Sequence, residues 1–259
     1  ADETPVQQLA PGTGKTKRAY IWAYRSNDYD DGPPIAVFDY QVNRNGEHAR
    51  DFLRDWRGHL MVDDYAGYKK LFEHGITELG CMAHARRKFF ELFSANQNPT
   101  AAEALRRIAE LYEIEASARE LNVEQRQLAR VAAQEKLQSY KQWLDETRLR
   151  VADGGALAKA IDYSLKRWPA FTRYADTGHL PIDNNPVENI IRPIAIGKKN
   201  WLFAGSERAG KRAANIYTLL ATAKLNGIEP SAWLNDTLEK LPTWPHSRID
   251  ELLPIKLRN

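Results

Sequence analysis

The sequence predicts an α/β protein whose core of strands and helices is interrupted by an all-helical insertion. Three observations predict this class. The first third of the chain holds short segments rich in β-branched and aromatic residues, residues 86–168 carry a 3.6-residue apolar period, and helical patterns continue after residue 186. With 259 residues, of which 43% are hydrophobic, the chain can bury a substantial core.

Three strands come first in this prediction. The runs TPVQQLA, KRAYIWAYRS and PIAVFDYQV are separated by PGTGK and SNDYDDGPP, which are rich in turn-forming residues. Because consecutive strands with short links pair with each other, these runs predict an antiparallel meander.

A helix and a fourth strand follow the meander. In NRNGEHARDFLRDWRG, the residues Ala49, Phe52, Leu53 and Trp56 recur at helical spacing, and HLMVDD is a short apolar run that ends in acids. We expect this strand to lie parallel to an existing neighbour, because a helix connects them. AGYKKLFEHG then predicts another helix, and ITELGCMAH predicts another strand.

The helical block extends from about Arg86 to Trp168 and contains almost no strand-forming sequence. Pro169 and TRYADTGHLPIDNNP end the block. A pair of basic helices around 186–226 and a short helix near 230–240 complete the predicted order.

Charge is distributed unevenly along the chain. The net charge of +3 and a pI near 8.8 are too mild to indicate nucleic acid as the partner. From 192 to 212, however, six cations stand against the single acid Glu207, a net charge of +5, and Arg86-Arg87-Lys88 form a second basic cluster. Either cluster alone is compatible with a plain solvated face.

The cysteine content and the lack of long apolar runs indicate the cell compartment that the sequence predicts. The single cysteine, Cys81, excludes an intrachain disulfide and fits a reducing cytoplasm. No apolar run approaches the roughly 20 residues of a membrane helix, and no leader pattern begins the chain. Because the sequence starts at Ala1 without methionine, we expect further sequence upstream.

Three acids stand where strand or helix ends would present them. Asp2 heads the first strand, Asp63 and Asp64 follow HLMV, and Glu188 lies on the helix after the insertion. Three carboxylates are the hard oxygen ligands that magnesium or manganese prefers. Acids also cap helices, and Asn185-Pro186-Val187-Glu188 has the spacing of an N-cap with an acid three residues later. Pattern alone therefore leaves the ligand and cap interpretations of Glu188 open.

Longer motifs carry a family resemblance. ADET, VDDYAGY, GCMAHARRKFF and IDNNPVENIIRPIAIGKKNWLFAGS together resemble the catalytic domain of the insertion-sequence-66 family of bacterial transposases. The similarity extends over nearly the whole chain, including IEPSAWLNDTLEKLPTWPHSRIDELLP, which resembles the C-terminal element of that family. The resemblance implies a ribonuclease H-like mixed sheet flanked by helices. It also implies four segments: core 1–85, helical insertion 86–180, core 181–228 and C-terminal element 229–259.

The resemblance further implies an Asp-Asp-Glu triad at Asp2, Asp63 and Glu188, which would hold Mg²⁺ or Mn²⁺ and cleave and join DNA strands at insertion-sequence ends. Asp63 occupies the matching second position, whereas Asp64 stands where the family usually has glycine. We interpret Asp64 as a solvent-facing turn acid, because neighbouring strand residues face opposite sides. We expect Pro193 to end or kink the helix that carries Glu188.

Further residues are candidates for DNA contact. The Cys-x-x-His element could place His84 near a phosphate, or it could be a buried thiol and a hydrogen-bonded histidine; zinc would need four ligands, and the chain lacks a second cysteine pair. Trp201 could stack on an unpaired base or fill the core. The candidate DNA-binding residues are His84, Arg86, Arg87, Lys88, Arg192, Lys198, Lys199, Trp201, Lys211 and Arg212.

The predicted function is therefore that of a cytoplasmic, metal-dependent DNA transposase whose partners are transposon ends and target DNA. We expect it to form a homo-oligomer on DNA, with accessory transposition proteins as possible partners and no membrane association. A nuclease or resolvase that cuts without joining is the first alternative, and a non-catalytic DNA-binding scaffold is the second.

Overall fold

The computed structural model describes residues 1–255, which form two compact units. The first unit contains residues 1–55, 66–68 and 186 onward, and the second contains 56–65 and 69–185. Each unit has its own hydrophobic core. The fold is mixed α/β with a helical insertion, as the sequence predicts, and agrees with a ribonuclease H-like class.

The first unit is built on a four-stranded sheet in the order β3-β2-β1-β6. Strands β1 (Asp2–Ala10), β2 (Lys15–Arg25) and β3 (Ala36–Gln41) form the predicted antiparallel meander. Strand β6 (Phe203–Ala204) adds a short parallel edge beside Gln7 and Gln8. The meander is thus confirmed, and β6 makes the sheet mixed.

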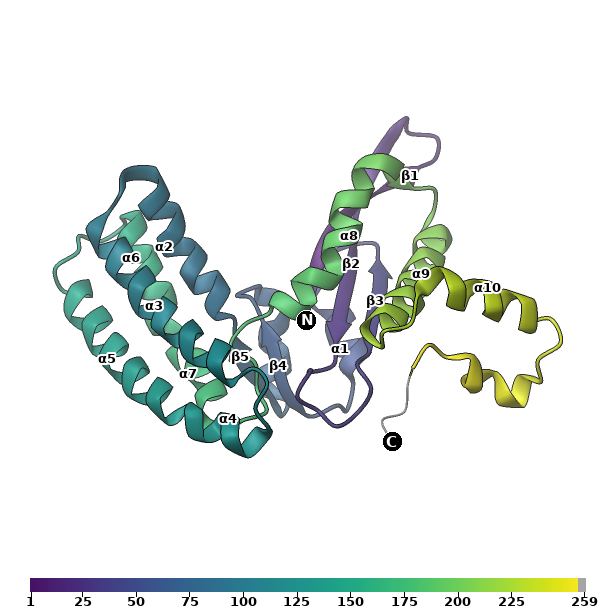
Figure 1. Ribbon diagram of the computed structural model, residues 1–259. Helices are drawn as coiled ribbons and strands as arrows, with labels where there is room; N and C mark the ends of the chain where they lie inside the picture. Colours follow the sequence, from purple (N-terminus) through teal and green to yellow (C-terminus); the bar gives the residue numbers. More distant parts are fainter. Residues whose placement is uncertain (256–259) are drawn as a thin grey trace. The chain divides into compact units, whose positions relative to one another are not determined.

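Helices α8 (Asn185–Trp201) and α9 (Glu207–Leu225) pack on one face of this sheet (Figure 1). Their apolar residues Val187, Ile191 and Ala214 join a core with strand residues such as Val6 and Phe38. Alternation along each strand places these strand residues on one face.

The other face of the sheet is covered by α1 (Glu47–Leu53) and by Tyr68. The ring of Phe52 stacks on Tyr24 with centroids 3.9 Å apart, and Tyr68 meets Trp22 edge-on at 5.7 Å. Trp22 and Tyr68 are fully buried. One face of the sheet is therefore covered by α8 and α9, and the other by α1 and aromatic side chains. Consecutive residues of β1 point to opposite faces.

The second unit begins with β4 (Gly58–Val62), which pairs in parallel with β5 (Ile76–Gly80). The expectation that β4 lies parallel to an earlier strand is therefore wrong: β4 pairs with the strand that follows it, in a separate two-stranded sheet. Residues Ala66–Glu73, predicted as a helix, form a 3₁₀ helix of 8 residues, which is long for this type. The predicted strand ITELGCMAH ends at Gly80, since helix α2 begins at Met82.

The helical insertion contains the predicted run of helices. These are α2 (Met82–Asn96), α3 (Pro99–Ala118), α4 (Val123–Ala129), α5 (Val131–Arg148), α6 (Ala156–Lys166), α7 (Trp168–Thr172) and a 3₁₀ turn at Arg173–Asp176. Apolar side chains such as Phe89, Ile108 and Leu137 form their common core. At Gly80 an added Cβ would lie 2.6 Å from the ring of Phe171, so α7 packs directly on β5.

The chain ends with α10 (Pro230–Lys240) and a 3₁₀ helix at His246–Leu252. Of the two effects expected of Pro193, the end of the helix is wrong: α8 continues through the proline to Trp201. Ile191 and Ile194 both pack in the core on the sheet, so tertiary contacts hold the helix on both sides of the proline. None of the helices in the described part of the chain has the length and apolar character needed to cross a membrane.

Candidate active site

Asp2 is the first residue of β1 and pairs with Ala23 of β2. The strand is therefore held by its neighbour from its first residue. The Asp2 Oδ1 accepts a hydrogen bond from the backbone N–H of Glu3 at 2.8 Å. Asp2 belongs to the same strand face as Thr4 and Val6, the face on which α8 packs.

Glu3, beside Asp2, is a buried acid that the sequence patterns did not single out. Its side chain is 1% exposed. The Tyr68 hydroxyl donates to Glu3 Oε2 at 2.7 Å, and Arg44 Nε donates to Oε1 at 2.6 Å. Burial and the neighbouring Glu3 carboxylate raise the pKa of Tyr68 well above its usual value. Glu3 is thus occupied on both oxygens and anchors the start of β1 to Tyr68 and Arg44 of the same unit.

Asp63 directly follows β4 and is half-buried. Its Oδ1 accepts the backbone N–H of Tyr65 at 2.9 Å, an Asx turn that orients the carboxylate. Its backbone carbonyl accepts a hydrogen bond from Arg167 Nη2 at 2.9 Å. Both the side chain and the main chain of Asp63 are therefore held.

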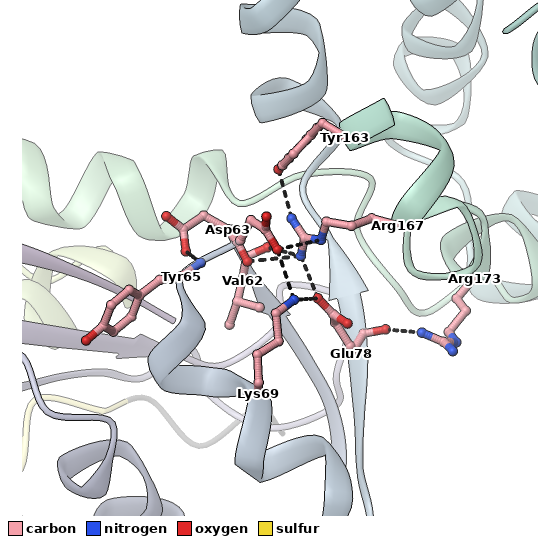
Figure 2. Close-up of polar contacts among 9 residues, drawn as sticks. Val62, Asp63, Tyr65, Lys69, Glu78, Tyr163, Arg167 and Arg173 are labelled. Carbon is pink, nitrogen blue, oxygen red and sulfur yellow. Dashed lines mark hydrogen bonds and ion pairs between the residues drawn. The ribbon is translucent and has the colours of Figure 1, made fainter. Parts of the chain in front are cut away.

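Arg167 lies at the centre of a polar network next to Asp63, which Figure 2 shows. Its Nη2 donates to Glu78 Oε1 at 2.7 Å, and its Nη1 donates to the Tyr163 hydroxyl at 2.8 Å. Lys69 lies 3.4 Å from the same Glu78 oxygen. Sequence periodicity could not reveal this network, because its members lie in different elements and are brought together only by the packing of the insertion.

Asp64 is involved in different contacts from its neighbour Asp63. Its side chain is 39% exposed, and Oδ1 lies 2.9 Å from Lys69 Nζ and 3.7 Å from Arg167 Nε. These contacts agree with an exposed turn acid whose charge is balanced by cations.

Glu188 lies in the first turn of α8 and is half-buried. The helix begins at Asn185, so Asn185 is its first residue and not the residue before it. Asp183 accepts hydrogen bonds from the backbone N–H of Asn185 at 3.0 Å and from its side-chain amide at 2.8 Å. The Tyr112 hydroxyl donates to Asp183 Oδ2 at 2.7 Å, the oxygen that also accepts the Asn185 side-chain amide. Asp183 thus serves this helix start, a role that the sequence patterns assigned to Asn185.

Cys81 and His84 lie at the start of α2. Cys81 is fully buried at the N-cap position, and its Sγ accepts the backbone N–H of Asn184 at 3.2 Å. His84 is half-buried in the first helical turn. Cys81 therefore has the environment of a buried structural thiol.

The cations of α2 are exposed and lie against aromatic rings. The guanidinium of Arg86 lies 5.6 Å from the centroid of Phe90, and Lys88 Nζ lies 4.3 Å from that of Tyr163. Arg87 is exposed as well. Arg86, Arg87 and Lys88 therefore lie at the surface of the second unit, where ring contacts hold Arg86 and Lys88.

The second basic cluster belongs to the first unit. Lys198 Nζ donates to the Pro5 carbonyl at 3.0 Å, and Lys211 pairs with Glu207 at 2.7 Å. Trp201 packs against the core of this unit. The remaining members of the cluster, Arg192, Lys199, Arg208 and Arg212, are exposed.

The candidate residues are thus divided between the units. Asp2 and Glu188 belong to the first unit, together with the cluster from Arg192 to Arg212. Asp63, His84 and the cations of α2 belong to the second.

Comparison with known proteins identifies relatives over almost all of the chain. The uncharacterized proteins y4hP and y4qI of Sinorhizobium fredii are each 36% identical to it over 98% of its length. A third protein of that organism, y4jD, is 32% identical over 98%. The chain spans about half the length of these relatives, namely 49%, 50% and 52%. No solved structure matches the chain.

Two family models match consecutive parts of the sequence. The first, described as the transposase IS66 family, matches residues 1–212 and so includes Asp2, Asp63 and Glu188. The second, described as the IS66 C-terminal element, matches residues 218–255. The chain therefore belongs to the IS66 family of DDE transposases.

Proposed function

We propose that this chain is the catalytic part of a transposase that cleaves DNA at insertion-sequence ends and joins the freed ends to target DNA. Asp2, Asp63 and Glu188 would be the catalytic carboxylates. The observation that carries the proposal is the family match over residues 1–212, which includes all three acids.

The residues at these positions suit a divalent cation. All three side chains are carboxylates, the hard oxygen ligands that Mg²⁺ and Mn²⁺ prefer. The backbone hydrogen bonds to Asp2 Oδ1 and Asp63 Oδ1 hold these groups in place, and the Asp63 carboxylate has four lone-pair sites, so its one bond leaves room for a metal. Metal ions bound there would supply the activation of the attacking oxygen and the stabilisation of the leaving oxygen that phosphoryl transfer needs.

The other residues of the chain would bind and orient DNA. In the proposed order of events, a water oxygen attacks the phosphate at the transposon end, and the released 3′-hydroxyl then attacks a phosphate of the target. Neither step needs a covalent bond to the protein. The exposed cations of α2 and of the cluster from Arg192 to Arg212, with His84, would contact the phosphates, whereas Trp201, packed on the core, would support this surface.

Because the chain spans about half of its relatives, its partners are also part of the proposal. They are transposon ends, target DNA and further copies of the protein on DNA, with accessory transposition proteins as additional candidates. The division of the chain at 85, 180 and 228 into core, insertion, core and C-terminal element likewise stays a prediction.

Replacement of each acid of the Asp63-Asp64 pair tests the proposal. Asp63→Asn should reduce both cleavage and joining to background while DNA binding is retained, because the change removes a metal ligand but adds no bulk. Asp64→Asn is the matched control and should lower the rates by no more than about 10-fold, as expected of a group that does not hold the metal. The assay combines end-containing DNA, target DNA and Mg²⁺ or Mn²⁺, and separates cut from joined products.

Each other outcome has a definite meaning. Strand joining by Asp63→Asn would refute the assignment of this residue. Cleavage without joined products in the unmodified chain would favour a nuclease or resolvase, and metal-independent DNA binding without cleavage would favour a scaffold.

A further inference from the structure

Arg167 is a buried arginine whose contacts the proposed chemistry does not explain. It connects α6 to α7, and its side chain is 3% exposed. A guanidinium removed from water must recover the lost solvation from partners inside the protein. Those partners therefore indicate what the residue does.

The partners of Arg167 lie at the end of β4. Its Nη2 contacts two successive backbone carbonyls, Val62 O at 3.4 Å and Asp63 O at 2.9 Å (Figure 2). The same nitrogen donates to Glu78 on the neighbouring strand β5. The rigid guanidinium therefore ties the exit of β4 to β5, and it holds the backbone from which the Asp63 side chain extends.

The network also gives three nearby acids different partners: two are paired with cations, and the third is not. Asp64 and Glu78 both pair with Lys69 and Arg167. Within residues 1–255, Asp63 has no ion pair, and its Oδ1 receives only the neutral N–H of Tyr65. The two cations thus neutralise the acids beside Asp63 and leave the charge of Asp63 itself for a ligand.

Burial opposes the charge of Arg167, but Tyr163, Glu78 and Asp64 outweigh that effect and raise its pKa. The guanidinium therefore stays protonated. The rings of Tyr163 and Phe171 lie 5.5 and 5.4 Å from its central carbon, which limits its movement.

We propose that Arg167 is the positioning residue of the second catalytic carboxylate: it fixes the backbone at Asp63 and holds Asp64 away from the ligand set. This inference rests on the proposed function. It assigns a role to the helical insertion, which supplies to the strand end of Asp63 a guanidinium that bonds the backbone carbonyl of Asp63, next to Lys69 of the core segment 1–85.

The first test measures backbone hydrogen–deuterium exchange in the unmodified chain and in Arg167→Lys, which keeps the charge but cannot span both carbonyls and Glu78. Exchange over residues 62–66 should increase on the order of 10-fold, because the N–H of Tyr65 is bound to Asp63 and depends on this geometry. The matched control is Arg173→Lys. Arg173 donates to the Glu78 carbonyl at 2.5 Å and contacts the same strand, but none of its described contacts reaches residues 62–64.

The second test measures Mn²⁺ binding by electron paramagnetic resonance, with Asp63→Asn as the reference for a lost ligand. Arg167→Lys should weaken Mn²⁺ binding about 10- to 100-fold and alter the spectrum of the bound ion. Arg173→Lys should leave both unchanged. If Arg167→Lys does not fold, Glu78→Gln provides the second variant, since it removes the charge that orients the guanidinium but keeps an acceptor.

The outcomes distinguish this inference from the proposed function. Unchanged exchange at 62–66 in Arg167→Lys, or equal changes in both arginine variants, would overturn the positioning role and leave the transposase proposal intact. If Asp63→Asn binds Mn²⁺ normally, or if the unmodified chain binds none, the metal site itself is refuted. This holds even if hydrogen–deuterium exchange at 62–66 increases in Arg167→Lys. Greater exchange with unaltered Mn²⁺ binding would reduce Arg167 to a structural residue.

Discussion

At the scale of single residues, adjacent acids have different roles at two strand ends. Glu3 is buried between Tyr68 and Arg44, whereas Asp2 beside it receives a backbone N–H. Asp64 pairs with Lys69, whereas Asp63 receives the N–H of Tyr65. In both pairs one acid carries structural contacts, and the family resemblance assigns the ligand role to the other. For Asp2 and Glu3 the division follows from the strand, in which neighbours face opposite sides, whereas Asp63 and Asp64 lie in the turn after β4, where Asp63 bonds the N–H of Tyr65.

Tyr68→Phe tests the structural role of Glu3 in the pair Asp2 and Glu3. The change removes the hydrogen bond to the buried carboxylate of Glu3 without changing the packing on Trp22. The free energy of unfolding should fall by about 1.5–3 kcal/mol, the range for hydrogen bonds to charged groups. Denaturant unfolding measures the effect. Tyr20→Phe on β2 is the control: within residues 1–255 its hydroxyl has no recorded hydrogen bond, and an equal loss in both variants would contradict the role of Tyr68.

At the scale of elements, α9 is tightly fitted to the edge strand β3. The Thr218 hydroxyl accepts the N–H of Phe38 at 2.8 Å, and Thr222 bonds both the N–H and the carbonyl of Ala36 at 3.2 and 3.0 Å. These side chains take the place of a further strand, so the edge is covered. Close approach is possible because Gly210 lies against the ring of Tyr40.

Gly210→Ala should therefore destabilise the first unit, although alanine favours helices. An added Cβ would lie 2.4 Å from the Tyr40 ring, which is 1% exposed and held by a hydrogen bond to Gln8 at 3.0 Å. We expect a loss of about 1–3 kcal/mol, typical of overpacking. Gly197→Ala in α8 is the matched control. Its Cβ would meet the Trp201 ring at an ordinary 3.5 Å, so helix propensity should prevail and add about 1 kcal/mol.

Thermal and denaturant unfolding of both glycine variants provide the measurement. A stabilised Gly210→Ala variant would contradict the close contact between α9 and β3. A destabilised Gly197→Ala variant would show that backbone freedom at that position, rather than space, matters.

At the scale of the whole molecule, both units bury tyrosine side chains. Burial is the largest cause that raises the pKa of each of them, and for Tyr40 the value rises to about 12. Nearby acids add to the effect for Tyr24, Tyr68 and Tyr112. The full set is Tyr24, Tyr40, Tyr68, Tyr112, Tyr140, Tyr163 and Tyr174.

These tyrosines predict a loss of stability in alkali. An unfolded tyrosine ionises near pH 10, whereas the folded one stays protonated, so the unfolded state binds fewer protons above that pH. The free energy of unfolding should be unaffected by these groups below pH 10. From pH 10 upward it should fall by about 1.4 kcal/mol per pH unit for each tyrosine that stays protonated in the fold.

This effect is measured by recording circular dichroism and tyrosinate absorbance together as the pH rises from 9 to 12. Tyr40 contributes between pH 10, where the unfolded side chain ionises, and its folded pKa of about 12. Most tyrosinate signal should appear together with unfolding. Ionisation of all tyrosines near pH 10 in a chain that keeps its helical signal would contradict the burial of these hydroxyls.

Local pattern was sufficient for most of the elements. The turn-rich links between three β-branched runs identify the meander, and the 3.6-residue period identifies the helices from α2 to α7, because both depend on neighbours in the chain. The motifs around Asp2, Asp63 and Glu188 were enough to recognise the family, because each is a run of consecutive residues that can be identified without the fold.

The sequence by itself thus determined the element order, the family and the candidate acids. Only the tertiary structure decided that β4 pairs with β5, that α8 passes through Pro193, and that Arg167 reaches the backbone of Asp63. The physical reason is the same in each case. Strand pairing, helix packing and the solvation of a buried charge are contacts between residues far apart in the chain, here up to 105 positions for Arg167 and Val62, and no local pattern encodes them.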